Sequence, residues 1–234
     1  MCRGIRRCTE LGDRPEMWSR TSPLPPPGWF VDENLKFAEV LRVGARGDVR
    51  RSREMLMQVR GEEMREWYID HGQNSGVFRN RHYRVVVGRT ITALRGAPPS
   101  SMVDAVYRRD RYRCRYCGLR LFPIEVLRAY ECTIGTDVFA ATAKNASHGA
   151  ALVFRATYDH VDPLSCGGRH VPENIVTGCY SCNFGKGSYT LTQLGLDDPR
   201  AQPLPSGDWD GLVSLLPEFR NRSTDPNVLR TGGL

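Results

Sequence analysis

The first half of the chain carries one long helical pattern, between Arg50 and Asp70. Apolar residues recur there three or four positions apart, among Arg and Glu residues: Met55, Leu56, Val59, Met64, Trp67 and Tyr68. This spacing predicts an amphipathic helix that packs its apolar stripe on the core and has Gly61 as its weak point.

Alternating patterns predict strands in two other places. Apolar residues alternate on either side of Gly88-Arg89, which predicts a β-hairpin over residues 83–94. A second alternation runs from Leu152 to Val161 and predicts a strand with two different faces. One face would carry Leu152, Phe154, Ala156 and Tyr158, and the other Val153, Arg155, Thr157 and Asp159.

Helical signals mark three further segments. A serine cap and an acid in the first turn predict a helix that starts at residue 100 and ends near residue 111. A short helical piece is expected at residues 190–194, ended by Gly195, and a last helix at residues 208–216. The proline-rich residues 22–28 predict an extended, poorly packed tail.

Positive charge is concentrated in the first part of the chain. The net charge of +7 divides into +6 for residues 1–98, +3 for residues 99–191 and −2 for residues 192–234. Such an excess is expected if an anionic polymer lies along that side, and a solvated basic surface has the same composition. The candidate phosphate-contacting residues are Arg81, Arg84, Arg89, Arg109, Arg111 and Lys186. Lys186 also fits a simple solvated side chain.

Hydrophobic and charged residues make up 40% and 25% of the 234 residues, as in an ordinary soluble globular protein. No apolar run approaches the roughly 20 residues that cross a bilayer. The N-terminus lacks the apolar core of a signal peptide. We therefore expect a cytoplasmic protein without a membrane partner.

Four of the eight cysteines form two Cys-x-x-Cys pairs, Cys114/Cys117 and Cys179/Cys182. In a chain without a secretion signal, this arrangement favours Zn²⁺ over disulfides. Four thiolates complete a closed tetrahedral site, which predicts a structural zinc ion. The alternative is two unrelated pairs of buried thiols.

A second group of polar residues lies around His160. A neutral imidazole is a suitable general base, and the preceding Asp159 offers a hard oxygen ligand for a divalent cation such as Mg²⁺. Asn183 can add an amide oxygen, and Asn174 can orient the imidazole through a hydrogen bond. A metal with few protein ligands keeps positions for water and phosphate, which suits phosphodiester hydrolysis.

These motifs together resemble the HNH endonuclease family over about residues 100–195. The residues that carry the resemblance are Cys114-x-x-Cys117, Asp159-His160, Asn174 and Cys179-x-x-Cys182-Asn183-x-x-Lys186. The resemblance implies an α+β fold with a ββα-metal core, stapled by the four cysteines and extended by an N-terminal α/β region. Many relatives have histidine at the position of Asn183, and the asparagine variant is similar to the HNH domains of RNA-guided effector nucleases.

The resemblance also implies a role for each residue. His160 would activate water, Asn174 would position His160, and Asp159 with Asn183 would bind Mg²⁺ or Mn²⁺. The cysteines would bind structural Zn²⁺. The substrate would be DNA, cleaved to 5′-phosphate and 3′-hydroxyl ends. Restriction, phage defence and a mobile element all fit as biological settings.

The expected organisation has four parts: a tail at residues 1–28, an accessory region at 29–98, the nuclease domain at 99–196, and a C-terminal helix and tail at 197–234. The accessory region could contact DNA, a protein partner or a second copy of the chain. Residues 119–150 would be an insertion with some regular structure. The rival hypothesis is a zinc-stabilised nucleic-acid-binding or scaffold module without turnover.

Overall fold

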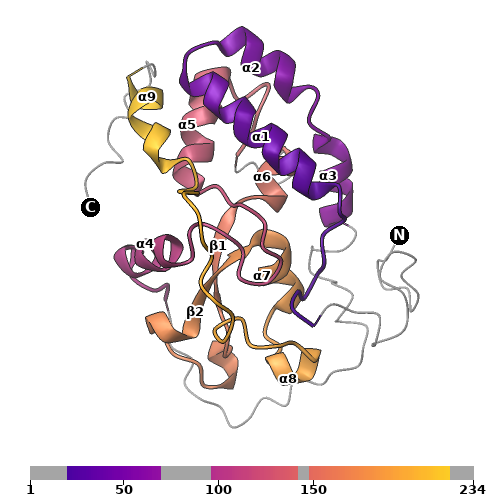
Figure 1. The fold of residues 1–234 in the computed structure, drawn as a ribbon, viewed down its shortest axis with the longest axis vertical. Coiled ribbons are helices and arrows are strands. Elements are labelled where there is room, and N and C mark those ends of the chain that lie inside the picture. The colour runs from indigo at the N-terminus through magenta and orange to yellow at the C-terminus, as the bar shows by residue number, and fades with distance from the viewer. Residues whose placement is uncertain (1–19, 70–95, 142–147, 222–234) are drawn as a thin grey trace.

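The fold places helices around a two-stranded antiparallel sheet (Figure 1). The computed structural model describes residues 20–69, 96–141 and 148–221, and the statements below concern these residues. The predicted hairpin at residues 83–94 lies outside them, as do Arg81, Arg84 and Arg89.

Three helices form the N-terminal part: α1 (Phe30–Ala45), α2 (Val49–Leu56) and α3 (Gly61–Trp67). The predicted single helix is thus wrong, because its pattern is divided between α2 and α3. The backbone N–H of Arg60 donates to the buried Glu33 carboxylate at 2.9 Å instead of continuing a helical ladder. The second helix then begins at Gly61 and packs closely against Gly149.

The middle of the chain adds α4 (Ser100–Arg109), α5 (Ile124–Ile134) and α6 (Gly149–Val153). The helix starts at Ser100, close to the predicted position, but the cap position is Pro99, no side chain caps the helix and its first turn holds no acid, so the predicted serine cap is wrong. Leu152 and Val153, predicted as the start of a strand, belong to α6 instead, and the strand begins only at Ala156. The side chain of His148 caps α6 by accepting from the N–H of Ala150, and small residues allow α6 to pack against α3.

The sheet pairs β1 (Ala156–His160) with β2 (Ile175–Cys179), and α7 (Tyr180–Lys186) follows directly. Ala156 lies opposite Cys179, and His160 lies opposite Ile175. Both α4 and α7 contact the two strands. The result is a strand, strand, helix unit, held against α4 (Figure 1).

The C-terminal part contains α8 (Leu191–Leu194) and α9 (Leu216–Arg220). The first confirms the predicted short helix, with Thr190 and Gln193 as a capping box and Gly195 at a φ of 65°. The predicted helix at residues 208–216 is wrong in its bounds. Gly211 and Leu212 both have left-handed backbones, which interrupt a helix before residue 213.

One hydrophobic core extends from Leu24 to Phe219. The ring of Phe37 in α1 lies 5.2 Å from the ring of Phe122 and 5.8 Å from that of Phe139, measured between centroids. The N-terminal helices therefore share their core with the segments that precede the sheet. The division into a separate accessory region stays a prediction.

Part of the predicted N-terminal tail is packed against the rest of the protein. Ser22 and Leu24 are buried, so the prediction of a poorly packed tail is wrong for these residues.

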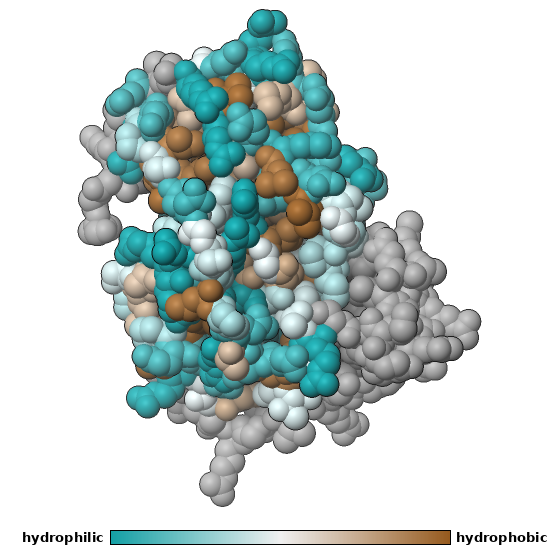
Figure 2. All heavy atoms as spheres, in the orientation of Figure 1, coloured by the Kyte–Doolittle hydropathy of each residue, from teal (hydrophilic) through white to brown (hydrophobic). Residues whose placement is uncertain are grey.

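On the face shown in Figure 2, hydrophobic residues form small groups among hydrophilic ones. No helix within the described ranges is both long and apolar enough to cross a membrane.

Candidate active site and metal centre

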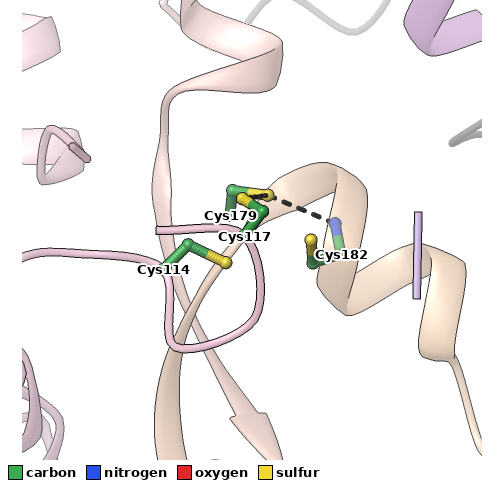
Figure 3. Close-up of side chains that lie close together, drawn as sticks. All are labelled: Cys114, Cys117, Cys179 and Cys182. Atoms are coloured by element: carbon green, nitrogen blue, oxygen red, sulfur yellow. Dashed lines mark hydrogen bonds between the residues drawn. The ribbon is translucent and has the colours of Figure 1, made fainter. Parts of the chain in front are cut away.

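The four cysteines of the two Cys-x-x-Cys pairs lie together, as predicted (Figure 3). Their Sγ atoms are all within 4.8 Å of one another, and those of Cys117 and Cys179 are 3.8 Å apart. A tetrahedron with Zn–S bonds of about 2.3 Å has edges of about 3.8 Å. The cluster is therefore positioned to bind a metal ion, and its thiolate donors are compatible with zinc.

A tight turn presents the first pair of thiols. The N–H of Gly118 donates to the carbonyl of Cys114 at 2.9 Å, and the N–H of Cys114 donates to the carbonyl of Leu119 at 2.9 Å. Gly118 has a φ of 76°, which glycine adopts without strain. The turn is joined to β2 because the N–H of Arg115 donates to the carbonyl of Thr177 at 2.8 Å.

The second pair lies where β2 passes into α7. Cys179 is the last strand residue, and its Sγ accepts from the N–H of Cys182 at 3.3 Å (Figure 3). Burial alone raises the pKa of the Cys114 thiol. Hydrogen bonds from Cys117, Cys179 and Cys182 outweigh burial and hold that pKa well below its ordinary value. The hydrogen bond with Cys114 raises the pKa of Cys117, and burial raises that of Cys182, so without a metal ion the cluster favours a thiolate at Cys114.

His160 ends β1 and faces another histidine. Its Nε2 atom lies 2.9 Å from Nδ1 of His170, which comes from the loop before β2. Burial, followed by the nearby His170 and Lys186, lowers the pKa of His160 to about 4. The imidazole is therefore neutral at physiological pH. Nε2 of His170 is buried and has no partner among the described residues.

Asp159 is held in a buried ion pair. Its carboxylate accepts from the Tyr116 hydroxyl at 2.5 Å and lies 3.2 Å from Nζ of Lys186. The Lys186 side chain is 0% exposed and also donates to the carbonyl of His160 at 2.8 Å. Burial raises the pKa of the Asp159 carboxyl, and Lys186 and Tyr116 partly offset that rise. Lys186 therefore points inward, and the predicted phosphate contact does not agree with this placement.

Asn183 projects from α7 towards β1. Its Nδ2 atom donates to Oγ1 of Thr157 at 3.1 Å and to the carbonyl of Tyr158 at 2.9 Å. No hydrogen bond to its Oδ1 atom is found within the described ranges. A Cβ atom built at Gly178 would lie 3.7 Å from Cβ of Asn183 and 3.8 Å from Cβ of Asp159. Position 178 thus lies beside both predicted ligands, at ordinary contact distance.

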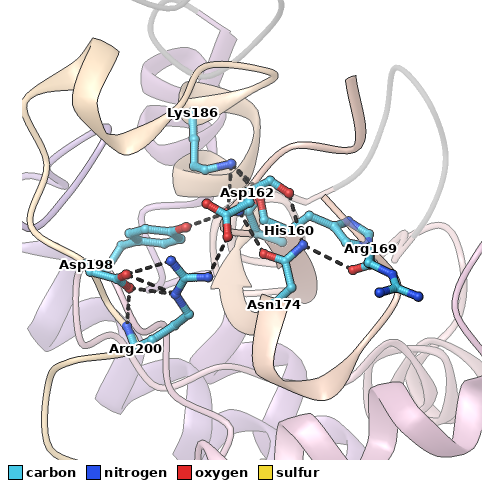
Figure 4. Close-up of polar contacts among 9 residues, drawn as sticks. His160, Asp162, Arg169, Asn174, Lys186, Asp198 and Arg200 are labelled. Carbon is cyan, nitrogen blue, oxygen red and sulfur yellow. Dashed lines mark hydrogen bonds and ion pairs between the residues drawn. The ribbon is translucent and has the colours of Figure 1, made fainter. Parts of the chain in front are cut away.

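Asn174 fastens the loop between the two strands (Figure 4). Its Oδ1 atom accepts from the N–H of Asp162 at 2.9 Å, and its Nδ2 atom donates to the carbonyls of Asp162 and Arg169 at 3.0 and 3.1 Å. These bonds go to the loop backbone rather than to the His160 ring. Asn174 can therefore position His160 only through the chain that it fixes.

A cavity of about 700 Å³ brings the polar residues together. Its lining includes His160, His170, Asn183 and Asp159. The cysteine cluster is absent from this lining, although Asn183 directly follows Cys182. The molecule thus has two adjacent sites, one closed and one open.

Residues 150–188 match the HNH endonuclease family. The match confirms the predicted resemblance and contains β1, β2, α7, His160 and the second cysteine pair. No curated protein and no solved structure matches the chain. The HNH segment supports a nuclease, and the mixed fold with its small sheet and four-cysteine cluster is consistent with an HNH core.

The predicted phosphate-contacting arginines differ in their placement beside the HNH segment. The guanidinium of Arg109 donates to the carboxylate of Asp110 and to the carbonyls of Pro172 and Ile175, at 2.8 to 3.0 Å. Arg109 therefore links α4 to the start of β2. Arg111 is exposed and lies just after α4.

Sequence reasoning missed His170, Tyr116 and Arg155 near the HNH site. His170 follows the Gly167-Gly168 turn, and Gly168 is required because a Cβ atom there would collide with the carbonyl of Asp162. Tyr116 lies between the first two cysteines, so the metal turn itself carries the hydroxyl that binds Asp159. The presence of Tyr116 between the two cysteines was the sequence signal that could have identified this contact.

Proposed function

We propose that the protein is a metal-dependent HNH endonuclease that hydrolyses phosphodiester bonds of DNA. One observation carries the proposal: His160, Asp159 and Asn183 line a single cavity within the segment that matches the family. An imidazole, a carboxylate and an amide oxygen together suit hydrolysis by activated water.

His160 acts as the general base in this proposal. Its low pKa keeps the ring neutral at physiological pH, so it can accept a proton from water. With Nε2 directed at His170, the atom that receives the proton is Nδ1. For this, Nε2 must carry the hydrogen and donate it to Nδ1 of His170, which fixes the orientation of the His160 ring.

Asp159 and Asn183 would hold Mg²⁺ or Mn²⁺ in this site. Their donor set fits a hard cation, because Asp159 offers carboxylate oxygens and the Oδ1 atom of Asn183 has no partner among the described residues. The bound ion would act as a Lewis acid and stabilise charge on the phosphate. Asn174 keeps the loop and hence the end of β1 in place.

The Lys186 ammonium supports a second candidate function. It already neutralises the Asp159 carboxylate in the interior, where a divalent cation would otherwise bind. This observation favours a zinc-stabilised DNA-binding module without turnover. The two candidates differ in turnover and in the binding of a divalent ion at Asn183, in addition to zinc at the cysteine cluster.

Cleavage of supercoiled plasmid and of single-stranded circular DNA tests the proposal, with Mg²⁺ or Mn²⁺ added to the zinc-loaded protein. We expect metal-dependent nicking that falls by about 10²–10⁴-fold in His160→Ala. Asn183→Ala should raise the metal concentration needed in a protein that still folds, although loss of its two hydrogen bonds to β1 should lower the unfolding temperature modestly. Leu204→Ala, at an exposed position outside the cavity, is the matched control.

Two results would contradict the nuclease proposal. One is the absence of metal-dependent cleavage of both substrates by a folded, zinc-loaded parent protein. The other is equal cleavage by the parent and by His160→Ala. Binding of DNA without cleavage would instead support the second candidate. Restriction, phage defence and a mobile element stay predictions for the biological setting.

A further inference from the structure

One wall of the active-site cavity is aromatic and partly exposed. Phe184, on α7 next to Asn183, is 45% exposed and lines the cavity together with Tyr180. The two ring centroids are 4.3 Å apart with a tilt of 39°. Four other large hydrophobic residues are similarly exposed in the described ranges, and none of them lines this cavity: Val31, Leu35, Met57 and Leu204.

Arg155 gives the same wall a positive charge. Its guanidinium carbon lies 4.2 Å from the centroid of the Tyr180 ring, in a cation–π contact. It forms no ion pair with a carboxylate in the described part of the chain. The carboxylate in the cavity lining belongs to Asp159, which is already paired with Lys186. The cavity therefore has an uncompensated cation suited to a phosphate.

Aromatic faces and an unpaired arginine are the two elements that bind single-stranded nucleic acid without a fixed sequence. Aromatic rings stack on exposed base faces, and arginine contacts the backbone. Bases inside a duplex have both faces covered by their neighbours, so only an unpaired base can reach a ring in a cavity wall. A cavity of about 700 Å³ is within the range that accommodates small ligands of nucleotide size.

We propose that the exposed ring of Phe184, supported from behind by Tyr180, stacks on an unpaired base of the substrate, with Arg155 on the adjacent phosphate. The favoured substrate is then DNA that has a single-stranded or extrahelical nucleotide beside the cleaved bond. This inference rests on the proposed nuclease function, because it assigns the substrate of the same cavity. Asn183 and Phe184 are consecutive, so the metal ligand and the stacking ring would come from one turn of α7.

Fluorescence of a DNA oligonucleotide that contains 2-aminopurine tests the inference without requiring cleavage. The His160→Ala protein, loaded with zinc, is titrated with the oligonucleotide as a single strand and as a duplex of the same sequence. We expect quenching and tighter binding of the single strand. Phe184→Leu should weaken single-strand binding by about tenfold, since it removes the ring but keeps an apolar side chain. Phe184→Trp should restore it.

Leu204→Ala provides the matched control, because this exposed apolar residue is outside the cavity lining. Arg155→Gln should weaken both forms of DNA if the arginine binds phosphate. Equal single-strand affinity of Phe184→Leu and its parent, or a preference for the duplex, would overturn the stacking inference. Stacking without cleavage by the unmodified protein would contradict the nuclease proposal alone, so the two failures are distinguishable.

Discussion

The cysteine cluster and the cavity around His160 are both built on the unit of β1, β2 and α7, but they differ in how accessible their polar groups are. Cys114, Cys179 and Cys182 are buried, and the four thiols face one another. His160 and Asn183 are only partly buried and line a cavity of about 700 Å³. In the cysteine cluster the four thiols are directed at one another and form a closed site. In the cavity, polar atoms of His160 and Asn183 remain available to a substrate.

Helix α7 shows how neighbouring residues enter different sites. Successive helix positions are about 100° apart, while positions four apart share a face. Cys182 and Lys186 are four positions apart and are both fully buried. Asn183 directly follows Cys182, so its side chain points in a different direction and lines the cavity. One helical turn therefore joins a structural scaffold to a candidate catalytic surface.

The largest expected effect comes from breaking the closed site. Cys182→Ser should release the metal and abolish cooperative folding, because structural zinc supplies roughly 10–16 kcal/mol of apparent binding energy in small domains. Metal content by elemental analysis and thermal unfolding by circular dichroism measure the two effects. Cys166→Ser, at a cysteine outside the cluster, should leave both unchanged. A folded Cys182→Ser protein that retains one zinc ion would contradict the assignment.

A smaller effect is expected from Lys186, which lies between the two sites. Lys186→Met should lower the free energy of unfolding by about 3–5 kcal/mol, because it leaves the Asp159 carboxylate buried without its cation. Adding Asp159→Asn should recover much of that loss. Urea denaturation measures both changes.

Arg50→Met is the matched control for this ion pair. Arg50 pairs with Glu54 at the surface, with the arginine side chain 87% exposed, and such pairs contribute less than about 1 kcal/mol. Equal losses from Lys186→Met and Arg50→Met would show that the buried pair has no special role in the scaffold.

The smallest expected effect is a pH shift in the open site. Burial with His170 and Lys186 lowers the pKa of His160 to about 4, so its protonation should not slow cleavage between pH 7 and pH 5. His170→Ala removes a neighbouring charge and exposes the ring, so the pKa should rise towards its ordinary value of about 6.5. The acid limb of the rate profile should then move to higher pH.

Single-turnover rates across pH and an NMR titration of His160 measure this shift. The NMR titration keeps the test independent of turnover. An acid limb that stays in place, together with an unchanged titration, would show that His170 does not influence the proposed base.

Local patterns predicted the parts of the fold that depend on local chemistry. The capped helix at Thr190 and the cysteine turn at Gly118 were both readable, because caps and tight turns are determined by a few adjacent residues. The start of the first strand was not readable. The alternation at Leu152 and Val153 fits a strand, and close packing of Gly149 against Gly61 selects helix α6 instead.

In the candidate site, too, some features could be predicted from the sequence and others depended on the folded structure. The spacing of the two Cys-x-x-Cys pairs indicated a thiolate cluster, since ligand type is a property of the side chain, and the HNH site was inferred from the resemblance to that family. Placement of the other groups needed the folded chain. Tyr116 reaches Asp159 across 43 positions of sequence.

The sequence by itself thus determined which chemical groups are present and which of them can bind metal. Only the tertiary structure decided that Lys186 faces inward to Asp159, that His170 meets His160 and that Phe184 borders the same cavity. The physical reason is that burial and pairing depend on segments far apart in the chain. Their energies appear only when helix, strand and loop pack together.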